Sequence, residues 1–148
     1  MTQRLVLGSD HAGRPLRLHL AVYLRERAHA VEDVGCPDAS SVDYPAYAEA
    51  VGRKVLAGEA TLGLLVCGTG LGVSMAANRL RGIRAALCSE PYVAQLARSH
   101  NDANVLCLGG RVVGPGLAEA IVEAFLATPF AGGRHAARLA QLEDLEKT

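Results

Sequence analysis

The sequence lacks an excess of charge of either sign, and it lacks any long apolar run. Its 148 residues carry 15 Lys and Arg against 15 Asp and Glu, so the formal net charge is zero. A neutral chain gives no global electrostatic argument for a nucleic-acid or membrane partner. No segment reaches the roughly 20 apolar residues of a membrane-spanning helix, and the apolar run near the start is too short for a signal peptide. We therefore expect a cytoplasmic protein that binds neither nucleic acid nor membrane.

The sequence also lacks the common motifs for metals and nucleotides. Its cysteines form no Cys-x-x-Cys pair and show no metal-ligand spacing, and they stand at positions 36, 67, 88 and 107. The glycine-rich loop at 68–72 is not the Gly-x-Gly-x-x-Gly dinucleotide fingerprint, because Val73 takes the place of its last glycine. It is not a P-loop either, because no Gly-Lys-Ser/Thr follows it. The cysteine spacing gives no sign of a metal site, and without a secretory signal we expect the four cysteines to be reduced thiols.

Short apolar runs alternate with segments of helical character along the chain. The runs predict strands over 4–8, 30–34, 62–66, 83–88 and 103–108. Helices of 10–15 residues between strands are typical of βαβ units, a parallel sheet and right-handed crossovers. We predict one doubly wound α/β domain over residues 1–148. A last helix, over 134–146 after the Gly132-Gly133 break, is predicted to project as a C-terminal arm.

The chain is organised around residues 62–84, where a buried strand leads into Cys67, a glycine loop and then a helix. Such a turn aims several backbone N–H groups and the positive end of a helix dipole at one point, which favours an anion. A helix start can also lower the pKa of a nearby thiol. A cysteine at a strand end is otherwise an ordinary core residue, as we expect for Cys88 and Cys107. For Cys67 both interpretations stay open.

Other polar residues follow the predicted strands directly. Asp10 and His11 come after the first strand, and Arg111 comes after the fifth. Because ligands of doubly wound sheets bind at the carboxyl ends of the strands, these residues are candidates for the same site as Cys67. His100 and Asn101 precede the fifth strand, so topology does not place them at that edge. The residues alone favour a small α/β protein that binds an anionic small molecule and has a thiol available for chemistry.

Six blocks of the sequence resemble the ribose-5-phosphate isomerase B family, which also includes galactose- and allose-6-phosphate isomerases. The blocks cover nearly the whole chain in order, and they are GSDHAG at 8–13, DYPAYA at 43–48, CGTGLGVSMAANR at 67–79, GIRAALCSEPY at 82–92, HNDANVLCLGGRVVG at 100–114 and GGRHAARL at 132–139. The resemblance implies a Rossmann-like three-layer α/β/α sandwich with a five-stranded parallel sheet. It also implies a homodimer, or a tetramer, that acts on a phosphorylated sugar without a cofactor.

The resemblance assigns roles by position. Cys67 matches the catalytic base, and Val73 stands where other members have a glutamate base. Thr69 matches a residue near the reacting oxygens, and His100 matches a histidine that assists opening of the sugar ring. The matching substrate contacts are an anion hole of Gly68, Gly70, Leu71, Gly72 and Asn101, sugar contacts from Asp10, His11 and Tyr44, and a phosphate clamp of Arg111, Arg134 and Arg138.

Several functions remain open at this stage. Ribose 5-phosphate is the expected substrate, with a hexose 6-phosphate or a tetrulose 4-phosphate as alternatives, because the same residues serve all three. A hydrolase or transferase that uses Cys67 as nucleophile with His100 would instead form a covalent adduct. A non-catalytic anion-binding module would need no thiol.

Overall fold

The computed structural model describes residues 2–148, and strands and helices alternate along it as predicted. The elements are β1 Arg4–Ser9, α1 Arg14–Glu26, β2 Ala30–Asp33, α2 Tyr44–Leu56, β3 Leu62–Cys67, α3 Leu71–Ala77, β4 Ala85–Leu87, α4 Pro91–Ser99, β5 Val105–Gly109, α5 Pro115–Ala127 and α6 Arg134–Leu145. Proline stands in the first turn of α1, α2, α4 and α5, where its missing N–H costs no helical hydrogen bond. None of the helices in this part of the chain is long and apolar enough to cross a membrane.

The five strands form one parallel sheet in the order β2-β1-β3-β5-β4. The chain moves outward from β1 to β2 and then returns to the other side of β1 with β3. This reversal places the loops after β1 and β3 side by side at the carboxyl edge. In open α/β sheets such a switch point forms the ligand crevice.

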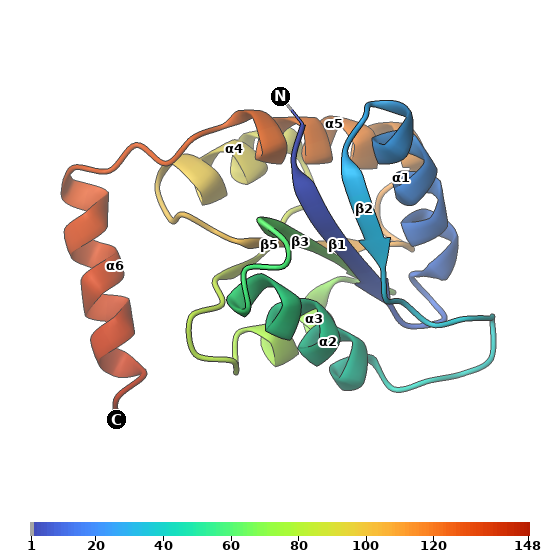
Figure 1. Ribbon diagram of the computed structural model, residues 1–148, viewed down its shortest axis with the longest axis horizontal. Helices are drawn as coiled ribbons and strands as arrows, with labels where there is room; N and C mark the ends of the chain where they lie inside the picture. Colours follow the sequence, from blue (N-terminus) through green and yellow to red (C-terminus); the bar gives the residue numbers. More distant parts are fainter. Residues whose placement is uncertain (1) are drawn as a thin grey trace.

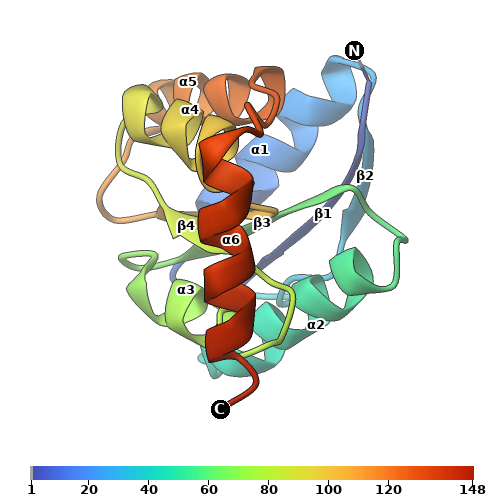
Figure 2. The same ribbon diagram turned by 90° about the vertical axis from the view of Figure 1, so that its left-hand side faces the viewer.

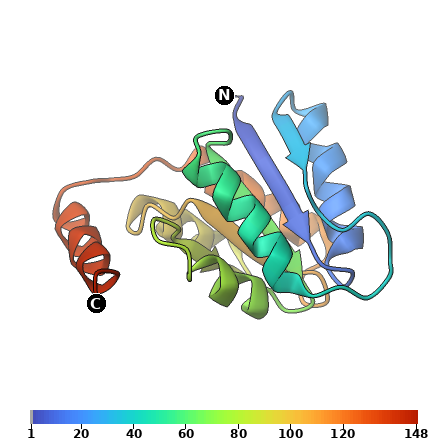
Figure 3. The same ribbon diagram turned by 60° about the horizontal axis from the view of Figure 1, so that its bottom comes forward.

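Helices cover both faces of the sheet, which confirms the predicted three layers (Figures 1 and 3). Alternate residues of each strand point to opposite faces: Leu64 and Leu106 pack on the side of α1, α4 and α5, whereas Leu65 and Val105 pack on the side of α2 and α3. Both sets are buried, which explains why the central strands are continuous apolar runs in the sequence.

The strands differ from the predicted ranges by one residue at an end, except for larger differences in β4 and at the start of β5. The edge strand β4 is shorter than the predicted run over 83–88, because the Ile83 N–H closes a turn on the Leu80 carbonyl and the Arg84 N–H donates to the Asn104 side chain. The strand β5 begins at Val105 rather than Ala103, because the Ala103 N–H still bonds back to Ala97 in α4. These local hydrogen bonds use backbone N–H groups that would otherwise pair with a neighbouring strand.

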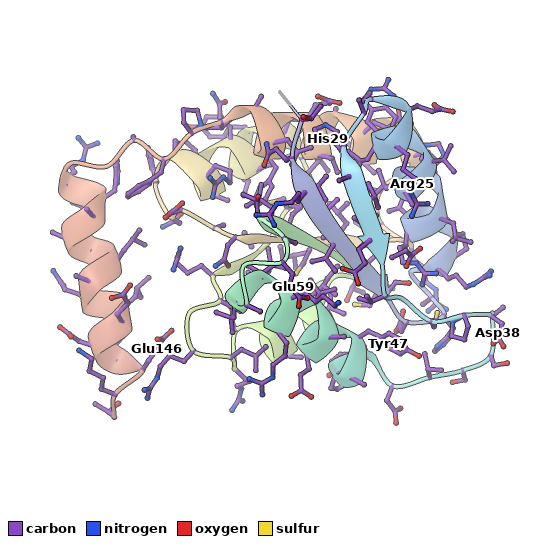
Figure 4. All side chains as sticks on the ribbon, viewed as in Figure 1. Arg25, His29, Asp38, Tyr47, Glu59 and Glu146 are labelled. Carbon is purple, nitrogen blue, oxygen red and sulfur yellow. The ribbon has the colours of Figure 1, made fainter. Side chains whose placement is uncertain are left out.

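The final helix α6 stands apart from the three layers (Figures 1 and 2). Gly132 and Gly133 precede it with φ of 67° and 58°, a left-handed backbone that most residues avoid. The helix touches its own domain near its two ends. His135 packs on His100 near the start, and Glu146, just past the end, accepts hydrogen bonds from Arg81 and the Gly82 N–H (Figure 4). The predicted separate arm is present, and it contacts its own domain near both of its ends.

Backbone segments approach one another closely at the carboxyl edge. A Cβ atom on Gly13 would lie 2.3 Å from the Val66 carbonyl oxygen, so the start of α1 can sit on the end of β3 only as glycine. By contrast, a Cβ on Gly116 in α5 would meet nothing within 4 Å.

We predict that Gly13→Ala destabilises the protein by about 1–3 kcal/mol or more, because the backbone must move to relieve the overlap. Gly116→Ala is the matched control and should be neutral or slightly stabilising, since alanine favours a helix. Urea unfolding of the three proteins measures the difference. Equal midpoints for both variants would contradict the close packing.

Candidate active site

Three loops meet at the carboxyl edge of the sheet and form the floor of the candidate site. The Gly110 N–H donates to the Cys67 carbonyl (2.8 Å), and the Arg111 N–H donates to the Gly68 carbonyl (3.0 Å), so the loop after β5 is bonded to the loop after β3. A Cβ on Gly110 would lie 3.2 Å from the Ala12 carbonyl oxygen, which places the loop after β1 beside them. The fold therefore brings together the residues that follow β1, β3 and β5, as predicted.

Cys67 lies at the end of β3 with its sulfur held by a backbone donor. The residue is buried, and the Gly70 N–H donates to its Sγ at 3.2 Å. An N–H donor aimed at sulfur stabilises negative charge there. Gly70 has φ of 83°, and a Cβ there would lie 2.4 Å from Leu87 Cδ1, so the turn that supplies this donor depends on glycine. The turn therefore fixes one backbone donor on the Cys67 sulfur.

The thiols of Cys88 and Cys107 are unsuited to carry a negative charge. Burial raises the pKa of the Cys88 thiol to about 11, and burial raises the pKa of the Cys107 thiol still further. Both residues therefore stay neutral at physiological pH and behave as core side chains, as predicted from the sequence. Val73, where some relatives of the resembled family have a glutamate base, is fully buried in the core.

The glycine loop uses some of its own N–H groups internally. The Gly70 N–H is bonded to Cys67 Sγ, and the Leu71 N–H donates to Thr69 Oγ1 at 3.2 Å. The helical ladder of α3 starts only at the Ser74 N–H, so the N–H groups of Gly72 and Val73 precede it and have no partner within the helix. Thr69 is exposed, and its hydroxyl keeps a proton to donate while it accepts from Leu71.

Asp10 and His11 are fixed by the backbone around them. Asp10 Oδ1 accepts from the Gly13 N–H at 3.0 Å, which closes the turn between β1 and α1. His11 Nδ1 accepts from the Val42 N–H at 3.1 Å. A ring nitrogen that accepts a hydrogen bond cannot carry a proton, so the neutral ring is protonated on Nε2. Nε2–H is therefore a donor for a ligand oxygen.

Tyr44 and Arg111 complete the carboxyl-edge group. A Cβ on Gly72 would lie 2.6 Å from Tyr44 Cζ, so the tyrosine ring lies directly over the glycine loop. Arg111 Nη1 lies 3.6 Å from the position of a Cβ on Gly68, so its side chain runs along the same loop. An aromatic ring, a guanidinium and a thiol thus surround one short backbone segment.

His100, Asn101, Arg134 and Arg138 lie elsewhere. His100 ends α4, and the residues after it lead to the amino ends of the strands, where the Gly63 N–H donates to the Asn104 carbonyl. The turn is held by Asp102, whose carboxylate accepts from Arg98 at 3.1 Å and Arg84 at 3.4 Å. Figure 1 shows α6 beyond one end of the sheet and the heads of the β1 and β2 arrows at the other. In one chain the predicted residues therefore form two separate groups.

Three residues of this second group, His100, Asn101 and Arg138, line a cavity between α6 and the domain. The cavity has a volume of about 470 Å³, and its lining includes His100, Asn101, His135, Arg138 and Leu142. The His100 and His135 rings stack with their centroids 4.2 Å apart and their planes 16° from parallel. Sequence reasoning missed His135, although it lies within the Gly-Gly-Arg-His block, because a lone histidine beside two arginines carries no periodic signal.

A second cavity of about 430 Å³ adjoins the first, and Leu142 and Leu145 line both. Leu142 and Leu145 are also 49% and 68% exposed, so the apolar face of α6 is only partly covered by its own domain. Within residues 2–148, His, Cys, Asp and Glu side chains form no cluster of three or more that could bind a metal ion.

The comparisons with known proteins agree with this geometry. The family model described as Ribose/Galactose Isomerase matches residues 5–142. The chain belongs to this family. Ribose-5-phosphate isomerase B of Escherichia coli K12 is 46% identical over 145 residues, which cover 98% of this chain and 97% of the relative.

Solved structures of family members have the same fold. A ribose 5-phosphate isomerase from Thermotoga maritima is 50% identical, with a TM-score of 0.96 over 97% of this chain and 99% of that one. The type B ribose 5-phosphate isomerase of Trypanosoma brucei is 46% identical, with a TM-score of 0.91 over 99% of this chain and 100% of that one. The five-stranded parallel sheet and the α/β layers are thus those of the family.

His135 links the docking of α6 to pH. Burial lowers the pKa of its ring from the ordinary 6.5, and His100, Arg134 and Arg138 lower it further by charge repulsion. A histidine whose pKa falls on docking binds protons more readily in the undocked chain. Docking is therefore strongest above pH 6.5 and weakens as the pH falls below that value.

We predict that acidification from about pH 7.5 to about pH 5.5 lowers the protection of the α6 amides, which is the exchange rate compared with the intrinsic rate at the same pH, because protonation disfavours the buried, stacked ring. His135→Phe keeps an aromatic ring without a titrating nitrogen, and it should remove most of this pH dependence. Hydrogen exchange read by NMR or mass spectrometry measures both proteins. The same pH dependence in His135→Phe would show that another group controls the helix.

Proposed function

We propose that this protein interconverts ribose 5-phosphate and ribulose 5-phosphate by proton transfer, as a single-domain enzyme over residues 1–148. The observation that carries the proposal is the Cys67 sulfur, held at the carboxyl edge by the Gly70 N–H among residues suited to bind a sugar. Support comes from relatives named ribose-5-phosphate isomerase B that match almost the whole chain.

The reaction needs a base that also acts as an acid. In the open-chain aldose, the Cys67 thiolate removes the proton from C2, and the electrons of the broken C–H bond form the double bond of an enediolate. The thiol then returns the proton to C1, and the hydroxyl proton of O2 passes to O1, which leaves the carbonyl of the ketose at C2. A cysteine can serve both halves of the reaction, because its thiolate accepts a proton and its thiol gives one back. The side chain ends the cycle unchanged.

The enediolate carries negative charge on oxygen, and preorganised donors lower its energy. The Gly72 N–H, which has no partner within α3, and the Thr69 hydroxyl serve this purpose, because the N–H groups of Gly70 and Leu71 already have partners within the loop. His11 Nε2–H and the Asp10 carboxylate hold the sugar hydroxyls, and Tyr44 covers the loop. No step in this sequence calls for a metal ion or an organic cofactor.

Two copies of the chain are needed to complete the site. The strand β5, whose five residues span roughly 16 Å at about 3.3 Å each, separates the edge of Cys67 from the edge where His100 and Asn101 lie. A single pentose phosphate cannot contact both groups in one chain. We propose a homodimer, with tetramers as a further level, in which each α4–α6 region faces the carboxyl edge of the other copy. His100 then assists ring opening and Asn101 completes the anion hole across the interface.

The same arrangement gives the phosphate a clamp from two chains. Arg111 comes from the carboxyl edge, whereas Arg134 and Arg138 come from α6 of the other copy. Guanidinium groups bind phosphate oxygens in pairs and so fix the far end of the substrate relative to the base. The partly covered leucines of α6 offer the apolar surface that such an interface needs.

The size of the sugar is part of the proposal. A galactose-6-phosphate isomerase subunit of Clostridium acetobutylicum is 41% identical over 120 residues, which cover 81% of this chain and 69% of that relative. The ribose-5-phosphate isomerases of Escherichia coli and Thermotoga maritima match over nearly all of both chains, so we place the pentose first. The four cysteines are free thiols, which suits a reducing compartment such as the cytoplasm.

We predict that a coupled assay shows faster turnover of ribose 5-phosphate than of allose 6-phosphate, galactose 6-phosphate or a tetrulose 4-phosphate.

Cys67→Ala should lower kcat by roughly 10²–10⁴-fold, because it removes the acid–base group. Cys88→Ala is the matched control and should keep kcat, since its neutral thiol lies on the other face of the sheet.

In D₂O the wild-type product should carry deuterium at the carbon that receives the proton, and EDTA should leave the rate unchanged. Full activity of Cys67→Ala would show that Cys67 is not the base. A stable mass increase on the protein after incubation with substrate would point to a covalent transferase or hydrolase instead.

We predict that mixing two inactive homodimers restores activity if the site is shared. Cys67→Ala damages the carboxyl-edge group and Arg138→Ala damages the clamp of the other chain. A mixed dimer has one doubly damaged and one intact site, so full subunit exchange should restore roughly a quarter of wild-type activity. Native mass spectrometry confirms the exchange. No recovery after confirmed exchange would mean that each chain serves its own site.

A further inference from the structure

Arg17 is a buried charged residue beside the candidate site that plays no part in the chemistry described above. It lies on α1, and its side chain is only 4% exposed. The neighbouring sheet-facing positions of this helix are apolar, namely Leu16, Leu20, Ala21 and Leu24. An arginine is almost never fully buried unless its guanidinium is paired. Its partners therefore indicate what it does.

The guanidinium joins three segments of backbone. Arg17 Nη1 donates to Ser9 Oγ at the end of β1 (2.7 Å), and Nε lies 3.1 Å from the Asp33 carboxylate at the end of β2. Nη2 donates to the Cys36 carbonyl in the following loop (2.9 Å). A Cβ on Gly35 would lie 2.0 Å from Nη1, so the loop passes directly over the guanidinium. One planar group thus sets the spacing of all three segments.

Each of these segments leads to a residue of the candidate site. Ser9 is followed directly by Asp10 and His11. Cys36 begins the loop that runs to Val42, whose N–H donates to His11 Nδ1, and that ends at Tyr44. Both sides of the His11–Val42 hydrogen bond are therefore attached to backbone that Arg17 holds.

We propose that Arg17 is a positioning residue of the site: it holds the end of β1 and the loop 36–43 at the spacing that fixes the His11 ring. A guanidinium suits this role because its donors point in several fixed directions from one plane, whereas a lysine presents three donors on a single nitrogen. The kinetic consequence rests on the function proposed above. The ring geometry of His11 is a property of the free protein and can be tested without substrate.

The test compares Arg17→Met and Ser9→Ala with Arg25→Met. Arg25 is an exposed arginine near the other end of α1 that donates to the Val31 carbonyl, so it is a matched control (Figure 4). In the free wild-type protein, ¹⁵N NMR of the imidazole should show His11 with an unprotonated Nδ1 and a protonated Nε2. Arg17→Met should weaken the hydrogen bond from Val42 to Nδ1, so the His11 ¹⁵N shifts should move toward those of a free neutral imidazole and the Val42 amide should exchange faster, whereas Arg25→Met should keep the wild-type spectrum.

Steady-state kinetics of the same variants provide the second measurement. Arg17→Met should lower kcat/KM for ribose 5-phosphate by about 10²-fold, as expected when groups that hold a substrate are displaced. Ser9→Ala removes one hydrogen bond of the network and should cost roughly tenfold. Arg17→Lys should fall between wild type and Arg17→Met. Inhibition by inorganic phosphate should stay unchanged in all of them, because the phosphate clamp does not belong to the network.

A folded Arg17→Met with the wild-type His11 spectrum and wild-type kcat/KM would overturn the proposal. Equal weakening of phosphate inhibition and of turnover would also overturn it, since that pattern reports general loosening. If Arg17→Met fails to fold, Ser9→Ala and Arg17→Lys decide by the same two readings. An inactive wild-type protein would refute the proposed function, and the His11 spectrum would still decide the role of Arg17.

Discussion

Close approach of backbone to backbone at the carboxyl edge of the sheet is the constraint on which the candidate site depends. Gly13 lies against the Val66 carbonyl, Gly109 lies against the backbone of Thr69, and Gly110 is bonded to the Cys67 carbonyl. A side chain at these glycines would occupy space that backbone atoms already fill. The three loops can therefore meet only because glycine stands at each contact, and the meeting places a thiol, a carboxylate and an imidazole within one small region.

The same packing gives Cys67 its chemical character. Its sulfur receives a backbone N–H from a turn that only glycine adopts readily, whereas Cys88 and Cys107 are surrounded by apolar side chains that raise the pKa of their thiols. What distinguishes Cys67 from these two thiols is one backbone donor on its sulfur and the loop that positions this donor. A base of this kind suits a proton shuttle between adjacent carbons, which is the reaction of the family's ribose-5-phosphate isomerases.

The architecture is also the basis for proposing that the site is completed by a second copy of the chain. A parallel α/β sheet separates the ends of its strands from the ends of its helices, so groups after β3 and groups after α4 cannot face the same small ligand within one domain. The helix α6 carries further cations at its own side of the molecule, with leucines that its domain covers only in part. In a dimer in which the α4–α6 region of one copy faces the carboxyl edge of the other, the two groups of residues would meet.

Much of this protein could be predicted from its sequence, because the signals concerned are local. Apolar runs, proline in the first turns and glycine-rich loops determined the order of the elements, the parallel sheet and the position of Cys67 at a strand end. The same local logic predicted that Asp10, His11 and Arg111 follow strands and share an edge with it, and the structure confirms this. Six sequence blocks in fixed order indicated the family, which the comparisons then confirmed.

Only the tertiary structure decided which side chains touch. His100 and Asn101 lie far along the sheet from Cys67, the buried ring of His135 stacks on His100, and Arg17 links the ends of β1 and β2 to the loop that holds His11. None of these contacts leaves a periodic pattern, because each joins residues from separate elements. The physical reason is that sequence pattern reports which face of an element is buried, whereas contacts across the fold depend on how whole elements pack.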